Sequence, residues 1–508
     1  MGDYKKLTPT NGFDFKDLLN ARQNNYAWSM GELGEYIYVG TGRNVVVSII
    51  KAIATRVGVD PTTINFPISI KPISEDNLGE IWRYKKDGSL PWKRVFKAET
   101  NSGIEGFRFM IGNRPFGGNP CLYAAAFGSE IKILKTTNGV DWEYVNTTNL
   151  LGTSSRAMVI HRGKVYVATI DEFNSGETPL LYASREPEFY SWKSVIGSGA
   201  NNPKGAITNM EVFNDRIYVA TSSEDGVQVW RSKNRDPKAD EWVCIVDKGF
   251  GDGANTFTLS IGVFDEYLYV SASKLLPLSW VIPLGCDIIR IDKRDNWRLV
   301  VGGPALIETN PIGHRGKSLS GLGSGFNNPF NVYAWQIKEY KGKLLVSTFD
   351  SATNVELILE LILANRTLLE ARIGEDTVRA LIKIFKLVVR LLNEKNYPFG
   401  FNLYVSSDGI NFDLAIRKGL CNRYNYGGRI LYVDKCNDLY IGTANPYQGC
   451  EVWKTNNVQP YHPCCHHQLY SSNSGVFYKE IYAEAKDDLA KVEEKIPQII
   501  EFLKNIEI

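Results

Sequence analysis

The stretch that decides the fold is "NNYAWSMGELGEYIYVGTGRN", residues 24–44, in which two apolar runs flank a short turn. Much the same phrase returns at residues 331–351 as "NVYAWQIKEYKGKLLVSTFDS". Strand-like runs on both sides of a tight turn are typical of a β-hairpin. A hairpin that recurs far along the same chain indicates a repeat architecture.

The second strand of this hairpin recurs along the chain as a β-rich run that ends in small residues. Each of these runs comes after another strand-like run and a polar turn, such as Arg162-Gly163 or Asn214-Asp215. A third strand comes after most hairpins, and a fourth carries a tryptophan, as in "WKRVF". Four strands in each of seven units predict an all-β fold, a seven-bladed β-propeller. The runs begin at residues 36, 121, 164, 216, 267, 343 and 438.

The last unit lacks a clear fourth strand after "GCEVWKTNN", residues 449–457. The N-terminal "YKKLTPTNGF", residues 4–13, is similar to the segments that come after the tryptophan strands in the other units. We therefore expect the propeller to be closed by an N-terminal strand, which leaves no exposed sheet edge. The predicted propeller spans residues 1–457, and residues 458–508 form a Cys/His-rich linker and a C-terminal helical tail.

The bulk composition excludes some classes of protein. The 508 residues contain 58 Lys and Arg against 56 Asp and Glu, so the formal net charge is only +2, which argues against nucleic-acid binding. The chain contains no apolar run long enough for a membrane span, and residues 1–19 lack the apolar core of a signal peptide. Eight cysteines in a chain of this length are too few for a disulfide scaffold. We expect a cytoplasmic protein.

Two turns between third and fourth strands share a pattern: "TTNGVDW" at 136–142 and "SSDGINF" at 406–412. An Asp or Asn that accepts local backbone hydrogen bonds, with Gly at positive φ after it, suits such a turn. The pattern resembles the Asp-box of sialidase-like (BNR repeat) propellers. In that family the box lies on the face away from the active site, so the resemblance implies the fold rather than catalysis.

Candidate ligand-binding residues gather on the face where second strands lead into third strands. Propeller loops on this face usually carry function, because a rigid scaffold presents them around a central channel. Arginines there can grip a carboxylate, and a carboxylic acid with a raised pKa can protonate a leaving group. The alternative is that these polar groups pair with one another at solvated loop ends. The candidates are Tyr26, Arg43, Arg108, Arg156, Asp171, Glu172, Tyr333 and Asp350.

Two insertions are predicted to be helical and to enlarge this face, at about residues 44–60 and 354–396. The second is rich in strong helix formers and is broken by "IGEDT", which indicates a helical hairpin. A basic stripe of Arg379, Lys383, Lys386 and Arg390 runs along its second helix at steps of four, three and four. This stripe is a candidate site for a protein partner or an anionic membrane surface; a cap docked on its own protein is the alternative. The insertions are expected to meet over the seventh blade.

The tail combines a cluster of metal-binding residue types with a helical pattern. The cluster is His462, Cys464, Cys465, His466 and His467. Its spacing matches no standard zinc site, so no metal or other cofactor is predicted, and whether the cluster binds a metal stays open. Beyond it, apolar residues at steps of three and four, beginning with Tyr482, Ala485 and Leu489, predict either docking on the propeller or self-association.

Three functions fit these patterns. The first is a non-enzymatic binding platform that uses the loop-rich face and the insertions to recognise a protein partner, an anionic small molecule or a glycan. The second is a glycoside hydrolase or lyase with a capped central pocket, and the third is a structural surface or coat component. The residues alone do not decide whether the protein is an enzyme.

Overall fold

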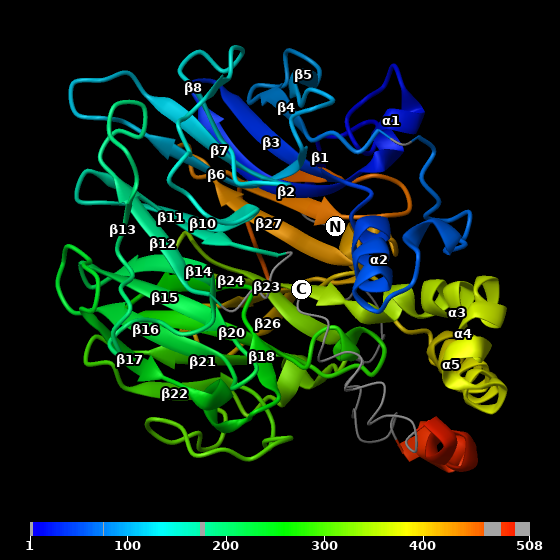
Figure 1. Cartoon of the computed structure of the whole chain (residues 1–508). Coiled ribbons are helices and arrows are strands. Elements are labelled where there is room, and N and C mark those ends of the chain that lie inside the picture. The colour runs from blue at the N-terminus through cyan, green and yellow to red at the C-terminus, as the bar shows by residue number, and fades with distance from the viewer. Residues whose placement is uncertain (1–3, 75, 173–177, 462–478, 493–508) are drawn as a thin grey trace.

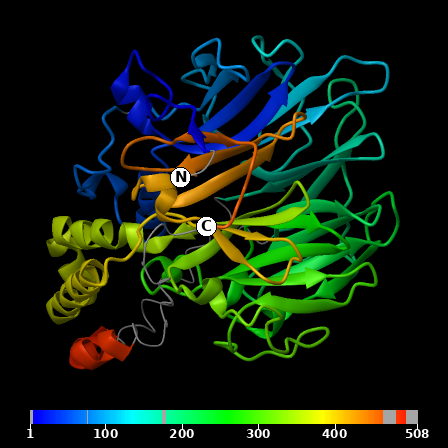
Figure 2. The ribbon, with the colours of Figure 1, turned by 180° about the vertical axis from the view of Figure 1, so that it is seen from behind.

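The computed structural model describes residues 4–74, 76–172, 178–461 and 479–492, and this part of the chain is mostly β-structure with a few helices. The strands are arranged around the molecule in chain order, so that the first strands lie beside the last ones (Figures 1 and 2). Antiparallel pairing groups consecutive strands into small sheets. This arrangement is that of a β-propeller.

The strands are numbered along the chain, and each sheet starts with its inner strand. The first sheet contains β2 (Asn24–Leu33), β3 (Tyr36–Arg43), β4 (Glu80–Lys85) and β5 (Lys93–Lys97). The second contains β6 (Ile104–Asn113), β7 (Cys121–Gly128), β8 (Ile133–Thr136) and β9 (Glu143–Tyr144). The third contains β10 (Ser154–His161), β11 (Lys164–Ile170), β12 (Leu180–Ser184) and β13 (Lys193–Ser194). The fourth sheet contains β14 (Ala206–Phe213), β15 (Arg216–Ser222), β16 (Gln228–Ser232) and β17 (Trp242–Val246). The fifth contains β18 (Asn255–Phe257), β19 (Ile261–Phe264), β20 (Tyr267–Lys274), β21 (Asp287–Ile291) and β22 (Trp297–Val301). The next sheet contains β23 (Asn331–Tyr340), β24 (Lys343–Asp350), β25 (Leu403–Ser406) and β26 (Asp413–Ile416). The last sheet contains β27 (Gly427–Val433), β28 (Leu439–Ala444) and β29 (Val452–Thr455).

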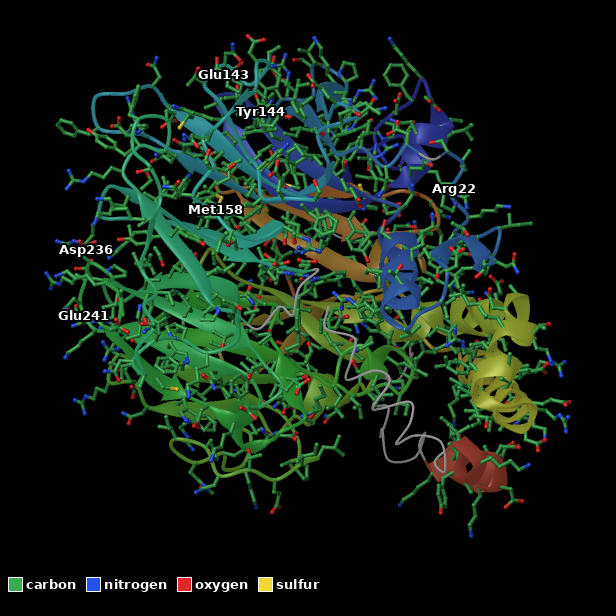
Figure 3. All side chains as sticks on the ribbon, viewed as in Figure 1. Arg22, Glu143, Tyr144, Met158, Asp236 and Glu241 are labelled. Carbon is green, nitrogen blue, oxygen red and sulfur yellow. The ribbon has the colours of Figure 1, made fainter. Side chains whose placement is uncertain are left out.

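In the second and third sheets the inner strand is more buried than the outer strand, and Figure 3 labels residues of both kinds. Met158 on the inner strand β10 is buried, whereas Tyr144 on the outer strand β9 is 51% exposed. Tight turns join the inner hairpins: Arg162 and Asn214 both adopt φ of 49°, as the predicted turns require. The inner strands thus place their side chains at the middle of the molecule.

The N-terminal strand β1 (Lys5–Lys6) completes the last sheet. It pairs antiparallel with β29, with Lys5 opposite Lys454 and Lys6 opposite Trp453, so the predicted pairing is confirmed. Behind it, the Phe13 ring packs on Trp92 of the first sheet, with ring centroids 4.6 Å apart. The N-terminal segment therefore contacts both the last sheet and the first.

A repeated turn precedes several of the inner strands. A glycine and the apolar residue after it both adopt positive φ, and an Asn at or just before the start of the next inner strand donates its side-chain N–H to the glycine carbonyl. The glycine supplies the left-handed conformation at little cost. The N-terminal segment contains the same turn at Gly12, although helix α1 separates it from Asn24. The pairs are Gly12 and Asn24, Gly249 and Asn255, Gly325 and Asn331, and Gly419 and Asn425.

Buried apolar clusters lie between neighbouring sheets. For example, Val229 of the fourth sheet packs with Leu268 and Ile289 of the fifth. The last and first sheets share a cluster in the same way, which includes Val452 and Trp82. Every sheet is thereby held on both sides by apolar side chains, the main favourable contribution to folding.

The two Asp-box-like turns have the local geometry that the sequence predicts. Asn138 Oδ1 accepts hydrogen bonds from the backbone N–H of Val140 and Asp141, both at 2.9 Å. Asp408 accepts the equivalent pair in the second turn, at 2.8 and 2.7 Å. Gly139 adopts φ of 74° and lies against a tyrosine of the preceding sheet, so the turn also contacts its neighbour.

The helices lie mainly in the two insertions and pack on one another there (Figure 1). Asn65 N–H donates to Asn365 Oδ1 at 2.8 Å, and Asn365 Nδ2 donates back to Asn65 O at 2.9 Å. Tyr447, from the last sheet, joins their shared apolar cluster, so the predicted meeting over that sheet is confirmed. The second insertion has three helices rather than two. The labelled helices are α1 (Leu18–Gln23), α2 (Val45–Arg56), α3 (Val355–Ala364), α4 (Arg366–Ile373), α5 (Glu375–Glu394) and the short α6 (Lys418–Cys421), with 3-10 turns at Pro61–Thr63, Lys248–Gly251, Leu278–Trp280, Ser324–Asn327 and Ser351–Asn354. Residues 479–492 are helical as well, and we call them the tail helix.

Candidate functional site

The candidate site lies where the inner strands converge, and β-bulges create it. In most inner strands one residue has no opposite partner, because the pairing register shifts there. A bulge re-aims the side chain of its extra residue. The residues at these shifts are Trp28, Arg108, Arg156, Thr208, Trp335 and Arg429.

Three of these bulge residues are arginines, and two of them lie over bulge tryptophans. The Arg108 guanidinium lies 4.7 Å from the Trp28 ring centroid and 4.4 Å from the Phe127 ring. Arg429 lies 5.4 Å from the Trp335 ring. Such cation–π contacts hold a planar guanidinium in place without a counter-ion. We call Arg108, Arg156 and Arg429 the axial arginines.

One carboxylate faces the axial arginines. Glu172, shortly after β11, forms ion pairs with Arg108 Nη1 and, at 3.6 Å, with Arg156 Nη2. Ser154 Oγ donates to the same carboxylate at 2.7 Å. Among the described residues no carboxylate lies within ion-pair distance of Arg429, and the Nε atoms of all three axial arginines are buried without a hydrogen-bond partner. Two of the three cations therefore share one carboxylate, and among the described residues the third has none within ion-pair distance.

Burial and mutual repulsion weaken the protonation of these cations. Burial, together with the nearby Arg156 and Arg429 charges, lowers the pKa of Arg108 well below its usual range. Burial lowers the pKa of Arg156 to about 10. Burial and the Arg156 charge lower the pKa of Arg429 to about 9. An added anion would relieve this electrostatic cost, because opposite charges nearby favour the protonated form.

Tyrosines form the other wall of the site. The Tyr26 and Tyr426 hydroxyls hydrogen-bond to each other, and Trp280 Nε1 donates to the Tyr333 hydroxyl. Burial raises the pKa of Tyr26 to about 12 and also raises that of Tyr333, so both phenols stay neutral and can donate or accept hydrogen bonds. The wall is therefore aromatic and polar but uncharged.

One further acid lies near Arg108. Glu105 occupies a second bulge of β6, and Asn77 Nδ2 donates to its carboxyl at 3.2 Å. Burial raises the pKa of Glu105, although this hydrogen bond and the Arg108 charge oppose the rise. A carboxyl of this kind retains its proton to higher pH than an exposed one.

Five of the eight predicted ligand-binding residues meet at this site: Tyr26, Arg108, Arg156, Glu172 and Tyr333. Asp171 is the neighbour of Glu172 and is half-buried. The sequence interpretation missed Arg429. A comparison of inner strands offers a signal, because Arg156 in "SSRAMV" and Arg429 in "GGRILY" both come after two small residues.

The other two predicted residues lie in buried networks of their own. Arg43 donates to the side chains of Asn20 and Asn24 at 2.8 and 3.0 Å and pairs with Glu80 at 3.5 Å. It anchors the first sheet instead of facing the centre. Asp350 is also buried, because it caps the turn at Ser351–Asn354 where the second insertion begins.

Asp350 is held by four donors. Gly400 N–H and Ala352 N–H donate to it at 2.7 and 3.0 Å, as do the hydroxyls of Tyr397 and Thr353. Burial outweighs these hydrogen bonds and raises the pKa of Asp350 to about 7. Asp350 therefore joins the insertion to the propeller and titrates near neutral pH.

The predicted basic stripe on α5 is exposed but largely paired. Lys383 and Arg390 form ion pairs with Asp488 and Glu484 of the helix at residues 479–492, and Arg379 pairs with Glu375 of its own helix. Lys386 is exposed. The tail helix therefore covers part of this stripe, and its role as a partner-binding site stays a prediction.

Two other sequence features have separate outcomes. His462, Cys464, Cys465, His466 and His467 lie outside the described residues, and within the described ones no group of His, Cys, Asp and Glu is arranged to hold a metal ion. Of the helices that the structure describes, none has both the length and the apolar character needed to cross a membrane.

Neither a protein-family model nor a curated protein matches the sequence. Solved structures with a similar arrangement include the WD40 β-propeller domain of Doa1, at 9% identity and a TM-score of 0.44, covering 90% of this chain and 98% of that one. A puromycin-hydrolyzing peptidase of Mycobacterium tuberculosis has 10% identity and a TM-score of 0.45, covering 90% of this chain and 56% of that one. The GH43_1 enzyme from Xanthomonas citri, complexed with xylose, has 9% identity and a TM-score of 0.27, covering 52% and 85%. At these values the likenesses carry no argument about what this chain does.

Proposed function

We propose that this protein is a non-enzymatic binding propeller whose centre receives a carboxylate group of a ligand presented at the loop-rich face. The propeller has seven blades, spans residues 1–457 and is closed by the N-terminal strand; residues 458–508 form a separate tail. Support for the closed ring comes from the β1–β29 pairing and from the apolar cluster that the last and first sheets share.

The observation that carries the proposal is the excess of positive charge at the centre. Arg108 and Arg156 share the single carboxylate of Glu172, and Arg429 lies over the Trp335 ring with no carboxylate among the described residues within ion-pair distance. Unpaired buried charges are costly, so a site that keeps them gains when an anion enters. The Glu172 carboxylate bridges two arginines, which is the way that a ligand carboxylate would bind.

The aromatic wall suggests what carries this carboxylate. Tyr26, Tyr333 and Tyr426 offer neutral hydroxyls beside flat apolar rings. Apolar ring faces with a few convergent polar groups are typical of small-ligand sites. A sugar acid, which combines a carboxylate with hydroxyls and an apolar ring face, fits this wall.

Calorimetry with glucuronate and glucose tests the proposal, since the two sugars differ in the carboxylate. We expect glucuronate to bind and glucose not to bind. Arg429→Met should abolish glucuronate binding, because it removes the cation that lacks a carboxylate partner. Arg298→Met, which removes an exposed arginine of β22, should leave binding unchanged. Equal binding of both sugars, or equal losses in both variants, would rule the axial arginines out as the anion site.

A second candidate function is glycoside hydrolysis, which the raised pKa of Glu105 favours. Glycosidases commonly use one protonated and one ionised carboxyl on opposite sides of the scissile bond. Glu105 and Glu172, which both interact with the Arg108 charge, would fill these roles. Release of nitrophenol from p-nitrophenyl glucuronide by the wild-type protein, lost in Glu105→Gln with glucuronate binding retained, would favour the enzyme over the platform.

A further inference from the structure

Outside the centre, the most developed surface is the contact between α5 and the helix at residues 479–492. The tail helix carries an acidic stripe of Glu480, Glu484 and Asp488 at steps of four, which therefore lie on one face. This stripe runs antiparallel to the basic side of α5. The ion pairs are Lys383 with Asp488, Arg390 with Glu484 and Lys395 with Glu480.

Apolar residues beside the acidic stripe complete the contact. Ala485 and Val492 of the tail helix are buried, and Ile481 packs against the apolar cluster formed by the second insertion. The expected seam is thus correct at Ala485 and Leu489, which is half-buried, but wrong at Tyr482, which is 57% exposed. Ile481, one position earlier, takes the place of Tyr482.

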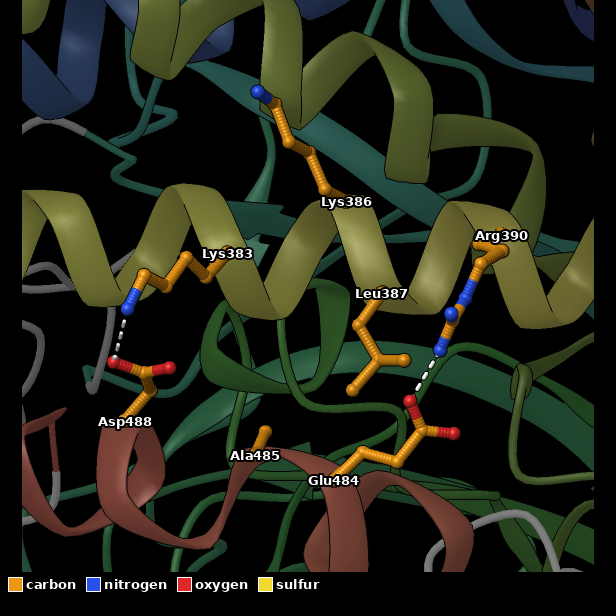
Figure 4. Close-up of a pocket in the computed structure, with 7 residues that line it drawn as sticks. All are labelled: Lys383, Lys386, Leu387, Arg390, Glu484, Ala485 and Asp488. Carbon is orange, nitrogen blue, oxygen red and sulfur yellow. Dashed lines mark hydrogen bonds and ion pairs between the residues drawn. The ribbon is translucent and has the colours of Figure 1, made fainter.

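The two helices do not close tightly on each other. A cleft of about 360 Å³ remains between them, lined by residues of both helices. Leu387 points from α5 toward the small side chain of Ala485, between the two ion pairs (Figure 4). A gap of this kind forfeits the dispersion contacts that a larger side chain would make. The lining residues are Lys383, Lys386, Leu387, Arg390, Glu484, Ala485 and Asp488.

The ion pairs are also of a weak kind. The side chains of Lys383 and Arg390 stay 58% and 51% exposed in their pairs. Exposed pairs contribute little and are screened by salt. The tail helix therefore complements α5 in charge and pattern, but it holds the surface loosely.

We propose that the basic face of α5 is the docking site for an acidic amphipathic helix of a partner protein, and that the tail helix is a built-in competitor for it. The partner helix carries acidic residues where the tail has Glu484 and Asp488. It places a large apolar residue where the tail has Ala485, and this residue fills the cleft against Leu387. Because the tail is tethered to the same chain, it competes at an effective concentration on the order of millimolar. Binding is therefore limited to helices that fit α5 better than the tail does.

Two labelled peptides test this proposal by fluorescence anisotropy. One has the sequence of residues 479–492, and the other has the same sequence with Ala485→Leu. Ala and Leu are both strong helix formers, so a difference in affinity reports the contact with α5. The receptor is the full chain with Glu480→Lys, Glu484→Lys and Asp488→Lys, which repel the basic face and release the tail.

We expect the Ala485→Leu peptide to bind the released chain about fifteen- to sixtyfold more tightly than the native peptide, since it buries two or three more carbons. Both peptides should bind the wild-type chain more weakly, because its tail competes. Adding Lys383→Gln and Arg390→Gln to the released chain should weaken the binding of both peptides, because neutral side chains remove the cations without attracting the reversed tail. Adding Arg298→Gln should leave binding unchanged.

Three results would overturn the proposal. Failure of both peptides to bind the released chain, while hydrogen exchange shows α5 still protected, would exclude the site. Equal affinity of the two peptides would exclude the cleft as the basis of selection. Dimers of the wild-type chain in native mass spectrometry, lost when the tail charges are reversed, would make a second copy's tail the occupant. None of these results depends on ligand binding by the axial arginines.

Discussion

Replacing Glu172 with glutamine tests whether the axial arginines share one carboxylate. The substitution keeps the size of the side chain, and its carbonyl can still accept the hydrogen bond from Ser154. It removes the negative charge that pairs with Arg108 and Arg156. Three guanidiniums then face one another in a buried site with no carboxylate partner among them.

The expected cost depends on the burial of this pair. Arg108 and Glu172 are each 8% exposed. Removing one partner of a buried ion pair costs about 3–5 kcal/mol, because the other charge stays buried and unpaired. We expect Glu172→Gln to lower the free energy of unfolding in urea by about this amount. Formate should restore much of it, since a small carboxylate can occupy the vacated position and stabilise the folded state by mass action.

A matched control uses an exposed acid. Glu130 is 68% exposed and pairs with Lys132 at 3.1 Å, so Glu130→Gln should change the stability by less than about 0.5 kcal/mol. Formate should act equally on this control and on the wild type. If Glu172→Gln is as stable as Glu130→Gln, or if formate stabilises both variants equally, the axial arginines do not depend on a shared anion.

Three further predictions concern the frame around the site. Phe13→Ala should lower the free energy of unfolding by about 3–5 kcal/mol, because Phe13 is buried in the apolar cluster that the last and first sheets share. Phe15→Ala should change this free energy little, because Phe15 is 57% exposed; urea unfolding measures both variants. Burial raises the pKa of Asp350 to about 7 in the folded protein, above the value of about 4 in the unfolded chain. Between these two pH values the unfolded chain binds fewer protons than the folded protein, so the free energy of unfolding falls as the pH rises. Asp350→Asn should flatten that fall in thermal unfolding between about pH 4 and pH 7. Gly139→Ala should lower the melting temperature more than Gly34→Ala does, and differential scanning fluorimetry compares the two variants. Both glycines have positive φ, but only at Gly139 would the new Cβ lie 1.7 Å from a tyrosine hydroxyl.

The propeller could be predicted from the sequence because its signals are local. Alternation and turn pairs such as Arg162-Gly163 identify each hairpin without knowledge of the remainder of the chain. The pairing of the N-terminal strand spans almost the whole sequence, yet it could be inferred because the last unit lacked a strand and the first residues resembled one. The repeat therefore made the β1–β29 pairing predictable from a comparison of short segments, although the two strands lie far apart in the sequence.

The site was harder to predict because it depends on irregularities. A bulge breaks the alternation from which side-chain direction is inferred, so nothing in the local pattern of β27 shows that Arg429 points to the centre. Arg43 and Asp350 occupy loop-side positions as predicted, but long-range partners such as Glu80 and Tyr397 draw them into buried networks. Tyr482 was misplaced because a helical pattern read over few turns leaves the buried face uncertain by one residue.

Two of the axial arginines and the basic face of α5 are paired with carboxylates of the chain itself, but the first site is buried and the second is exposed. Because of this difference in burial, salt should affect the two sites differently. In each, a carboxylate of the chain itself occupies a set of cations: Glu172 at the centre, and Glu484 and Asp488 on α5. Raising the salt concentration from about 0.1 to 1 M shortens the Debye length from about 10 to 3 Å, which screens exposed pairs far more than buried ones. Hydrogen exchange at high salt should therefore increase in the tail helix while the inner strands β6 and β10 stay protected. Salt-dependent exchange in those strands would instead mean that water reaches the axial arginines, and their unpaired charge would then carry no binding energy.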